Sequence, residues 1–166
     1  KGVTTEEMAA AYGALVNEGI YTKPRTFTRV EDSNGNVILE NEIQSNVAMK
    51  ASTAALMNSI LHDVVTGGTG TSASFSGMTL AGKTGTTNDQ RDRYFVGYSP
   101  YYVGACWVGY ESNSRVSSGG VNPAAILWNK VMSRIHEGLE NKSFFSCSDL
   151  VQVTVCADSG MLATNL

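Results

Sequence analysis

The stretch Leu80-Ala81-Gly82-Lys83-Thr84-Gly85-Thr86-Thr87 is the most informative part of this 166-residue sequence. Apolar residues before the lysine favour a strand, and two glycines remove side chains around it, so that a ligand's backbone could lie against this edge. The stretch therefore predicts a strand that ends in a lysine and a row of hydroxyl groups. On physical grounds Lys83, Thr84 and Thr86 form a carboxylate receptor, because an ammonium and two hydroxyl donors suit an anion.

The backbone of the same strand predicts a second kind of contact. Free N–H groups at a strand edge can pair with an extended peptide through main-chain hydrogen bonds. One of them, the N–H of Thr86, could face an oxygen that gains negative charge during a reaction.

Composition excludes several classes of protein. The chain is 42% hydrophobic and only 16% charged, which is typical of a folded globular domain. A net charge of −3 with scattered basic residues gives no electrostatic footprint for nucleic acid, so no nucleic-acid partner is expected. No run approaches the about 18 apolar residues of a membrane span, and the start shows no signal-peptide pattern, so we expect the chain itself to be soluble. Because it begins at Lys1 without a methionine, we also expect it to be cut from a longer protein.

The first half of the chain predicts two helices and a hairpin. Thr4 and Glu7 have capping-box spacing, and a helix follows until Gly19 can close it. Asn34-Gly35 is a strong turn signal, so that about residues 21–41 should form a surface hairpin. An apolar stripe predicts a second long helix over residues 46–65, which the following glycine run ends; its members are Thr53, Leu56, Met57, Ile60, Leu61 and Val64.

The second half predicts two more strands and a third helix. Residues 93–98 and 101–110 read as antiparallel strands joined by a tight turn at Ser99-Pro100. Asn122-Pro123 starts a helix that Gly138 can end. Its expected inner face consists of Ala124, Leu127, Trp128, Val131 and Ile135. A short strand is expected over residues 150–155, and no linker divides the chain into two domains.

The three cysteines leave the redox state open. Cys147 and Cys156 flank the expected final strand, and either a disulfide or two isolated thiols fits the sequence, while Cys106 lies in an apolar strand. No metal-ligand spacing surrounds them, and neither a metal nor another cofactor is expected.

A competing motif uses the same lysine. Gly77 to Thr84 formally satisfies GxxxxGK[ST], the phosphate-binding P-loop, which must follow a buried strand and open a helix. The residues before Gly77 make a poor strand, and a hairpin-like run follows Thr84, so the nucleotide-binding interpretation is disfavoured. No other catalytic set appears. His62 and His136 fall within expected helices and are interpreted as surface or capping residues.

The sequence around the lysine also resembles a known family. The run from Gly82 to Asp89, then Arg91-Asp92 and the residues 94–100 (YFVGYSP), is similar to the third-motif (KTG) strand and following hairpin of class A penicillin-binding proteins. The first helix, the hairpin at 32–38, the Gly68-Thr69-Gly70 loop and the residues 107–110 (WVGY) resemble that family in the same order. The similarity covers residues 2 to about 138.

The resemblance implies a fold and a reaction. The expected fold is α+β, an antiparallel sheet with helices packed on it, as a partial transpeptidase fold of the penicillin-binding-protein and serine β-lactamase type that lacks its N-terminal half. The implied reaction is acyl transfer from the D-Ala-D-Ala end of peptidoglycan stem peptides, which β-lactam antibiotics mimic. Lys83 and Thr86 would be catalytic, and Thr84, Gly85, Thr86 and Thr87 would bind substrate.

One departure from the family is serious. Neither SxxK nor SxN occurs in these 166 residues, so the nucleophilic serine would lie in an upstream part of the same domain, which would be the chain's partner. We expect the chain alone to be inactive, and residues 1–166 to form the C-terminal part of one domain, with 139–166 an extension of unassigned role. The parent protein would be anchored at the extracytoplasmic face of a bacterial membrane. The alternatives are a D,D-carboxypeptidase or β-lactamase fragment and a non-catalytic binding module.

Overall fold

The chain folds around a three-stranded antiparallel sheet, seen in a computed structural model that describes residues 2–163. The strand order is β5-β6-β7, with β5 at Ala81–Thr86, β6 at Asp92–Tyr98 and β7 at Val103–Gly109. The register pairs Lys83 with Val96 and Thr86 with Arg93. The two predicted strands at 93–98 and 101–110 are confirmed. The motif lysine, in contrast, is the third of the six residues of β5 rather than the residue that ends it.

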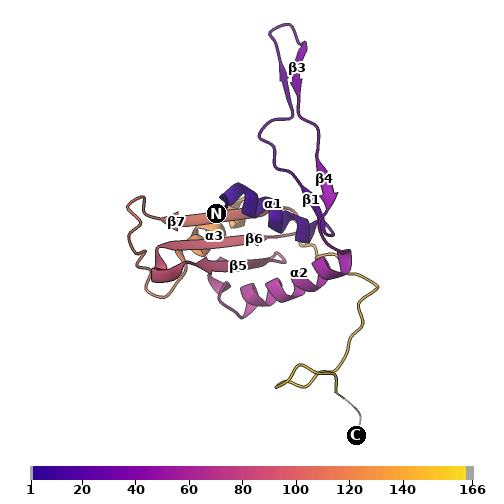
Figure 1. Ribbon diagram of the computed structural model, residues 1–166, viewed down its shortest axis with the longest axis vertical. Helices are drawn as coiled ribbons and strands as arrows, with labels where there is room; N and C mark the ends of the chain where they lie inside the picture. Colours follow the sequence, from indigo (N-terminus) through magenta and orange to yellow (C-terminus); the bar gives the residue numbers. More distant parts are fainter. Residues whose placement is uncertain (1, 164–166) are drawn as a thin grey trace.

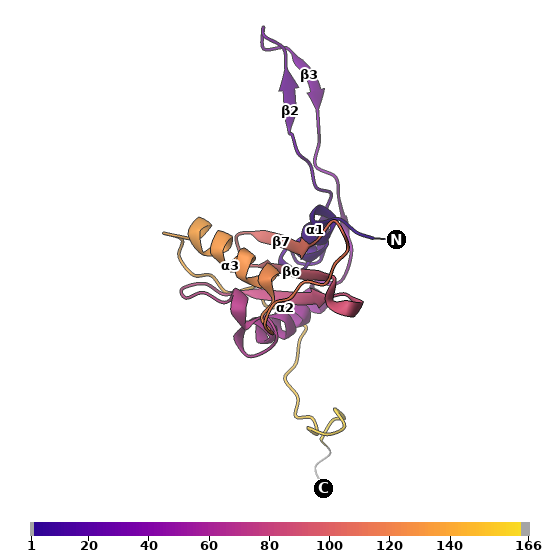
Figure 2. The same cartoon turned by 90° about the vertical axis from the view of Figure 1, so that its left-hand side faces the viewer.

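Helices cover both faces of the sheet, which makes the predicted α+β class correct. The helix α3 (Pro123–Ile135) lies on one face, and α1 (Thr5–Val16) lies on the other (Figure 2). The helix α2 (Ala51–Thr66) runs beside β5 (Figure 1). Short 3₁₀ turns, η1 (Thr71–Ala73) and η2 (Asn88–Gln90), precede and follow β5.

Two apolar clusters hold these layers together. On the α3 face, Phe95 and Trp128 are almost fully buried, with their rings 5.3 Å apart at an angle of 66°. On the α1 and α2 face, Leu15, Leu61, Ala81 and Tyr98 form the second cluster. Burial of such side chains stabilises the fold by roughly 1.5–3 kcal/mol for each large residue.

The predicted start and end of α1 are confirmed. The Thr4 side chain accepts a hydrogen bond from the Glu7 N–H at 3.1 Å, and the Glu7 carboxylate accepts one from the Thr4 N–H at 2.7 Å. This reciprocal arrangement is the capping box, which satisfies two otherwise unpaired donors of the first turn. Gly19 follows the helix with a φ of +86°, and its N–H binds the carbonyl of Ala14.

The hairpin is longer and more divided than predicted. β2 (Arg29–Glu31) and β3 (Val37–Glu40) flank the turn at Asn34-Gly35 as expected, and they stand away from the body of the molecule (Figures 1 and 2). Below them β1 (Ile20–Thr22) pairs with β4 (Ser45–Val47) to form a stem.

The prediction that α2 begins at residue 46 is wrong. Asn46 and Val47 belong to β4, because their backbones pair with β1, and the helix begins only at Ala51. The predicted apolar face is also rotated, since Leu56 and Ile60 are 51% and 56% exposed. The side chains that face the protein are mostly small and let the helix pack closely against the sheet; they are Ala54, Ala55, Asn58, Leu61 and Val65.

The inner face predicted for α3 needs the same correction. Asn122 caps the helix and Pro123 opens it, as expected. Ala124 and Trp128 are buried, but Leu127, Val131 and Ile135 are 45–50% exposed. Ala125 and Met132 take their places against the sheet.

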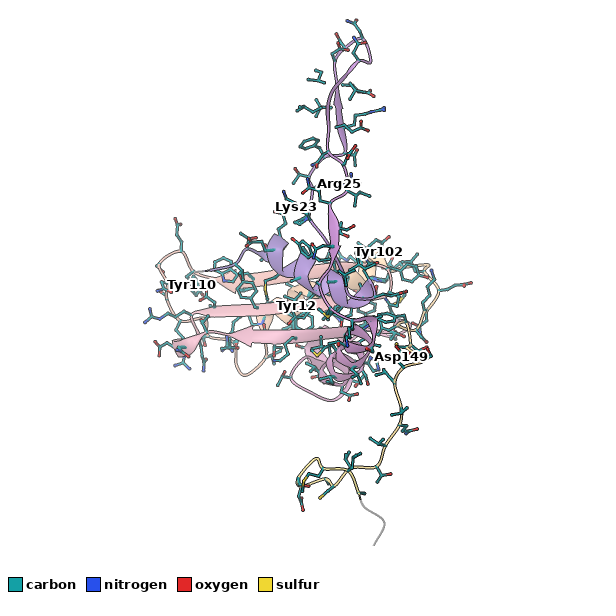
Figure 3. The ribbon with its side chains drawn as sticks, turned by 45° about the vertical axis from the view of Figure 1, so that its right-hand side comes forward. Tyr12, Lys23, Arg25, Tyr102, Tyr110 and Asp149 are labelled. Carbon is teal, nitrogen blue, oxygen red and sulfur yellow. The ribbon has the colours of Figure 1, made fainter. Side chains whose placement is uncertain are left out.

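The last part of the described chain contains no regular strand, so the strand expected at 150–155 is wrong. Only an isolated bridge joins Val155 to Leu162. This segment extends away from the body (Figure 1), and Asp149 lies near its start (Figure 3). Cys147 and Cys156 are free thiols, so the disulfide alternative is not realised.

Candidate active site on the edge strand

The open edge of β5 is the centre of the candidate site. Among the described strands, β5 pairs with β6 alone, so its other edge has no strand partner. A strand edge of this kind can hydrogen-bond an extended peptide. The strand is held at its start by the α2 residue His62, whose Nδ1 lies 2.7 Å from the carbonyl oxygen of Leu80.

Lys83 is exposed on this strand. Its ammonium donates a hydrogen bond to the carbonyl of Thr84 at 3.0 Å. Within residues 2–163 two ion pairs occur, Arg29 with Glu31 and Arg91 with Asp89, so no carboxylate neutralises Lys83 there. The ammonium is therefore available to a ligand or to a further catalytic group.

The pleat of β5 separates the lysine from the threonines. Neighbouring residues of a strand point to opposite faces, and directly paired residues share a face. Lys83 shares the face of its partner Val96 and of Ala81, whereas Thr84 and Thr86 share the opposite face with their partners Phe95 and Arg93. The prediction of one receptor formed by Lys83, Thr84 and Thr86 needs this correction, because the ammonium and the hydroxyls serve different sides of the strand.

Each threonine hydroxyl has a protein partner. Thr84 Oγ1 lies 2.9 Å from Thr69 Oγ1, which belongs to the glycine-rich loop after α2. Thr86 Oγ1 accepts a hydrogen bond from Arg93 Nη1 at 3.2 Å. Thr87 Oγ1 donates to the Asp92 carboxylate and accepts from the Asp92 N–H, both at 2.9 Å. The Thr86 hydroxyl accepts a hydrogen bond and keeps its own proton free to donate. The Thr87 hydroxyl, in contrast, already acts as both donor and acceptor.

A pocket of about 430 Å³ adjoins the end of β5. It lies between the start of α1, the C-terminal half of the strand and an indole of β7; its lining includes Val3, Met8, Gly85, Thr86, Thr87 and Trp107. Trp107 is fixed by a hydrogen bond from its Nε1 to Asp92 at 2.9 Å. Three of the four residues predicted to bind substrate therefore line one pocket, and Thr84 lies outside it.

A second pocket, of about 440 Å³, lies away from the motif strand. It is bounded by α1 and the stem of the hairpin, where Lys23 and Arg25 are found (Figure 3). Its lining is mainly apolar and contains no residue of the KTG motif.

The P-loop alternative is excluded by the backbone. Gly82, Lys83 and Thr84 lie inside a strand, and no α-helix follows them before Pro123. A P-loop needs a helix N-terminus directly after its lysine to supply the phosphate-binding N–H groups. Within the described residues no group of three or more histidine, cysteine, aspartate or glutamate side chains is placed to hold a metal ion.

Sequence reasoning missed the side-chain contacts of both histidines, although His136 is the C-cap residue of α3. His136, expected at the surface or in a cap, directly follows α3 but is buried, and its Nε2 lies 2.7 Å from the buried Ser99 Oγ in the turn between β6 and β7. The carbonyl of Met132 lies 2.7 Å from its Nδ1, so the imidazole donates there and accepts from Ser99. This pair ties the β6–β7 turn to α3, and no local pattern in the sequence signals a contact across 37 residues.

The chain matches known proteins over most of its length. Residues 1–133 match the family described as the penicillin binding protein transpeptidase domain. Penicillin-binding protein 1A of Clostridium acetobutylicum is 38% identical over 143 residues, which cover 86% of this chain and 18% of that protein. The Clostridium tetani protein of the same name is 35% identical over 99% of this chain and 22% of its own length. The chain thus spans about a fifth of these relatives.

Solved structures of penicillin-binding proteins and transpeptidase domains have a similar fold. The D,D-transpeptidase domain of a peptidoglycan glycosyltransferase from Eggerthella lenta has a TM-score of 0.69 at 27% identity, over 81% of this chain and 32% of that one. Penicillin-binding protein 1A from Haemophilus influenzae has a TM-score of 0.79 at 19% identity, and the match covers 98% of this chain and 31% of that chain. At that identity the second match shows the fold alone.

Proposed function

Because the chain belongs to the transpeptidase-domain family of class A penicillin-binding proteins, we propose that it supplies the KTG wall of a serine-type D,D-transpeptidase active site. The substrate would be the D-Ala-D-Ala end of a peptidoglycan stem peptide, bound along β5. The observation that carries the proposal is the open edge of β5, which presents on one face an ammonium without a carboxylate partner among the described residues and hydroxyl groups on the other face.

The geometry suggests a division of roles along the strand. Lys83 lies on the face of the strand opposite to the threonine hydroxyls, which are assigned to the substrate carboxylate. Its ammonium would therefore serve the other role, which is to assist proton transfer near the nucleophile. Thr86 would donate its free hydroxyl proton to the substrate carboxylate and its N–H to the oxyanion. Gly85 and Thr87 would bind substrate in the adjoining pocket, and Thr84 would add a hydroxyl from outside it.

The nucleophile would come from another part of the same domain. Neither SxxK nor SxN occurs in the sequence, so we infer that the attacking serine, its lysine and the second motif lie outside it. The serine would displace the terminal D-alanine, and an amine from a neighbouring stem would then displace the serine and form the crosslink. PonA1 from Mycobacterium tuberculosis, which shares the fold at 24% identity, has been solved in complex with penicillin V, and this supports β-lactams as ligands of the parent domain.

Domain organisation and location are part of the same proposal. Residues 1–166 would form the C-terminal part of one transpeptidase domain, whose parent protein is anchored at the extracytoplasmic face of the membrane. No described helix is long and apolar enough to cross a bilayer. Residues 139–166 would be an extension that begins on the body, where Phe144 packs against Tyr98 with ring centres 5.4 Å apart.

The decisive experiment changes Lys83 in the complete transpeptidase domain. Lys83→Ala should lower the rate of acylation by a labelled penicillin by at least ~10²-fold, as expected for loss of a preorganised charge. Unchanged labelling on a denaturing gel would remove Lys83 from this role. The chain of 166 residues alone should give no labelled band, and a band at its own mass would show that it carries a nucleophile.

A further inference from the structure

Arg93 lies on β6, outside the KTG motif, but next to the candidate site. It is the cross-strand partner of Thr86 and shares its face of the sheet. Its Nη1 donates to Thr86 Oγ1 at 3.2 Å, and its Nη2 donates to Gln90 Oε1 at 2.8 Å. The guanidinium is therefore fixed beside the hydroxyl that the proposed function assigns to the substrate carboxylate.

Among residues 2–163, no carboxylate forms an ion pair with the positive charge of Arg93. The ion pairs within residues 2–163 involve other arginines, and the Gln90 amide oxygen that receives Arg93 is neutral. A second guanidinium, that of Arg115, reaches the same oxygen at 3.1 Å. Arg93 Nε is buried and has no hydrogen-bond partner among the described atoms. Arg115 is exposed, so water can solvate its charge, whereas Arg93 is partly buried. An anion beside Arg93 would complete its contacts, because a partly buried charge is normally paired.

The hydrogen bond to Thr86 also sets the direction of its hydroxyl proton. Because Arg93 fills a lone pair of Thr86 Oγ1, the hydroxyl can donate but does not need to accept from a ligand. A carboxylate placed at this hydroxyl would receive the Thr86 proton and the second N–H of Arg93 Nη1. Charge-assisted, two-point binding of this kind suits a carboxylate.

We propose that Arg93 is a carboxylate-binding residue, which recognises the terminal carboxylate of the substrate together with Thr86. This inference rests on the proposed function and goes beyond it, since it assigns the carboxylate's counter-ion to β6 rather than to Lys83. It makes Arg93 responsible for discrimination between charged and neutral ends of a ligand.

The test compares two ligands that differ in whether their carboxylate carries a negative charge. Second-order rates of acylation by benzylpenicillin and by its methyl ester are measured on the complete transpeptidase domain and its Arg93→Gln variant. Arg93→Gln should lower the benzylpenicillin rate by roughly tenfold to a hundredfold, the range expected for a lost charged hydrogen bond. The rate with the methyl ester should change less than about twofold. Arg93→Lys, which keeps the charge but not the fork, should retain part of the preference for the carboxylate.

Controls separate this inference from its premise and from misfolding. Arg29→Gln removes the same charge from the distant hairpin, where Arg29 pairs with Glu31, and should leave both rates unchanged. If Arg93→Gln lowers the rates of both ligands equally, or changes neither, Arg93 does not bind the carboxylate. If Lys83→Ala acylates normally, the proposed function itself fails, whatever the result at Arg93.

Discussion

Thr84 Oγ1 and Thr69 Oγ1 lie 2.9 Å apart and join the motif strand to the glycine-rich loop that follows α2. The loop is itself fixed to the helix, since the Gly70 N–H donates to the carbonyl of Val64 at 2.9 Å. The orientation of the Thr84 hydroxyl thus depends on a residue 15 positions earlier in the chain.

The first prediction concerns this hydroxyl pair. Thr69→Val in the complete transpeptidase domain should slow acylation by benzylpenicillin roughly two- to tenfold, the equivalent of one hydrogen bond. Thr69→Ser keeps the hydroxyl and should behave like the native protein. The melting temperature of both variants should stay close to the native value, because Thr69 is exposed. Equal acylation by the valine and serine variants would show that the contact does not orient Thr84.

The second prediction concerns the close approach of backbone at Gly82. A Cβ at this position would lie 2.6 Å from Phe95 Cζ and 2.8 Å from the carbonyl oxygen of Val96. Gly82→Ala should therefore destabilise the protein by about 1–3 kcal/mol, as overpacking of a rigid core does. The measurement is urea unfolding. Gly67→Ala is the matched control, since a Cβ there has no heavy atom within 4 Å, and an equal loss in both variants would contradict the steric explanation.

The sequence allowed prediction of the sheet because its signals are local. The turn at Ser99-Pro100, the alternation around it and the cap at Asn122-Pro123 each specify backbone geometry within a few residues. The KTG strand was located for the same reason, but the position of its end was not predicted. Lys83 lies inside β5 because the pairing with β6 continues to Thr86.

What could not be predicted depends on contacts distant in sequence. The inner faces of α2 and α3 were assigned mainly to large apolar residues, but the unpredicted Ala54 and Ala125 are fully buried against the sheet, because close packing needs small side chains there. The pairing of β4 with β1 removed Asn46 from the expected helix. In the candidate site, the partners Thr69 and Arg93 come from another loop and another strand, and no motif spacing links them to Thr84 and Thr86.

The third prediction uses the buried phenol of Tyr98. Its hydroxyl donates to Asn58 Oδ1 at 2.7 Å, and Asn58 in turn donates to the carbonyl of Leu15 at 3.1 Å. Burial raises the pKa of Tyr98 well above its ordinary value of 10.0, and Tyr12 adds to the shift. A pKa raised on folding means that the stabilisation is complete below pH about 10 and is lost as the pH rises towards the folded-state value.

Tyr98→Phe should reveal this contribution. At neutral pH the variant should lose about 1–3 kcal/mol of unfolding free energy, because the Asn58 oxygen is left buried without its donor. Between pH 9 and about 11 its stability should fall less steeply than that of the native protein. Burial also raises the pKa of Tyr12, which is kept in both proteins and accounts for a residual slope. Parallel pH profiles from urea unfolding would show that Tyr98 is not the group responsible.

The last prediction concerns the capping box that places the start of α1 beside the candidate site. Hydrogen bonds from the backbone and side chain of Thr4 lower the pKa of Glu7 below its ordinary value of 4.5. A lowered pKa means that the cap stabilises the helix above pH about 4.5 and that this contribution is lost as the pH falls through the folded-state pKa. Thr4→Val removes the side-chain bonds, so the pKa of Glu7 should rise towards 4.5. An NMR titration of the side-chain carboxyl carbons measures it directly. Asp32 provides an internal control, because its pKa is lowered mainly by the Asn36 side chain and should not move. An unchanged pKa at Glu7 would show that Thr4 contributes through its backbone N–H alone.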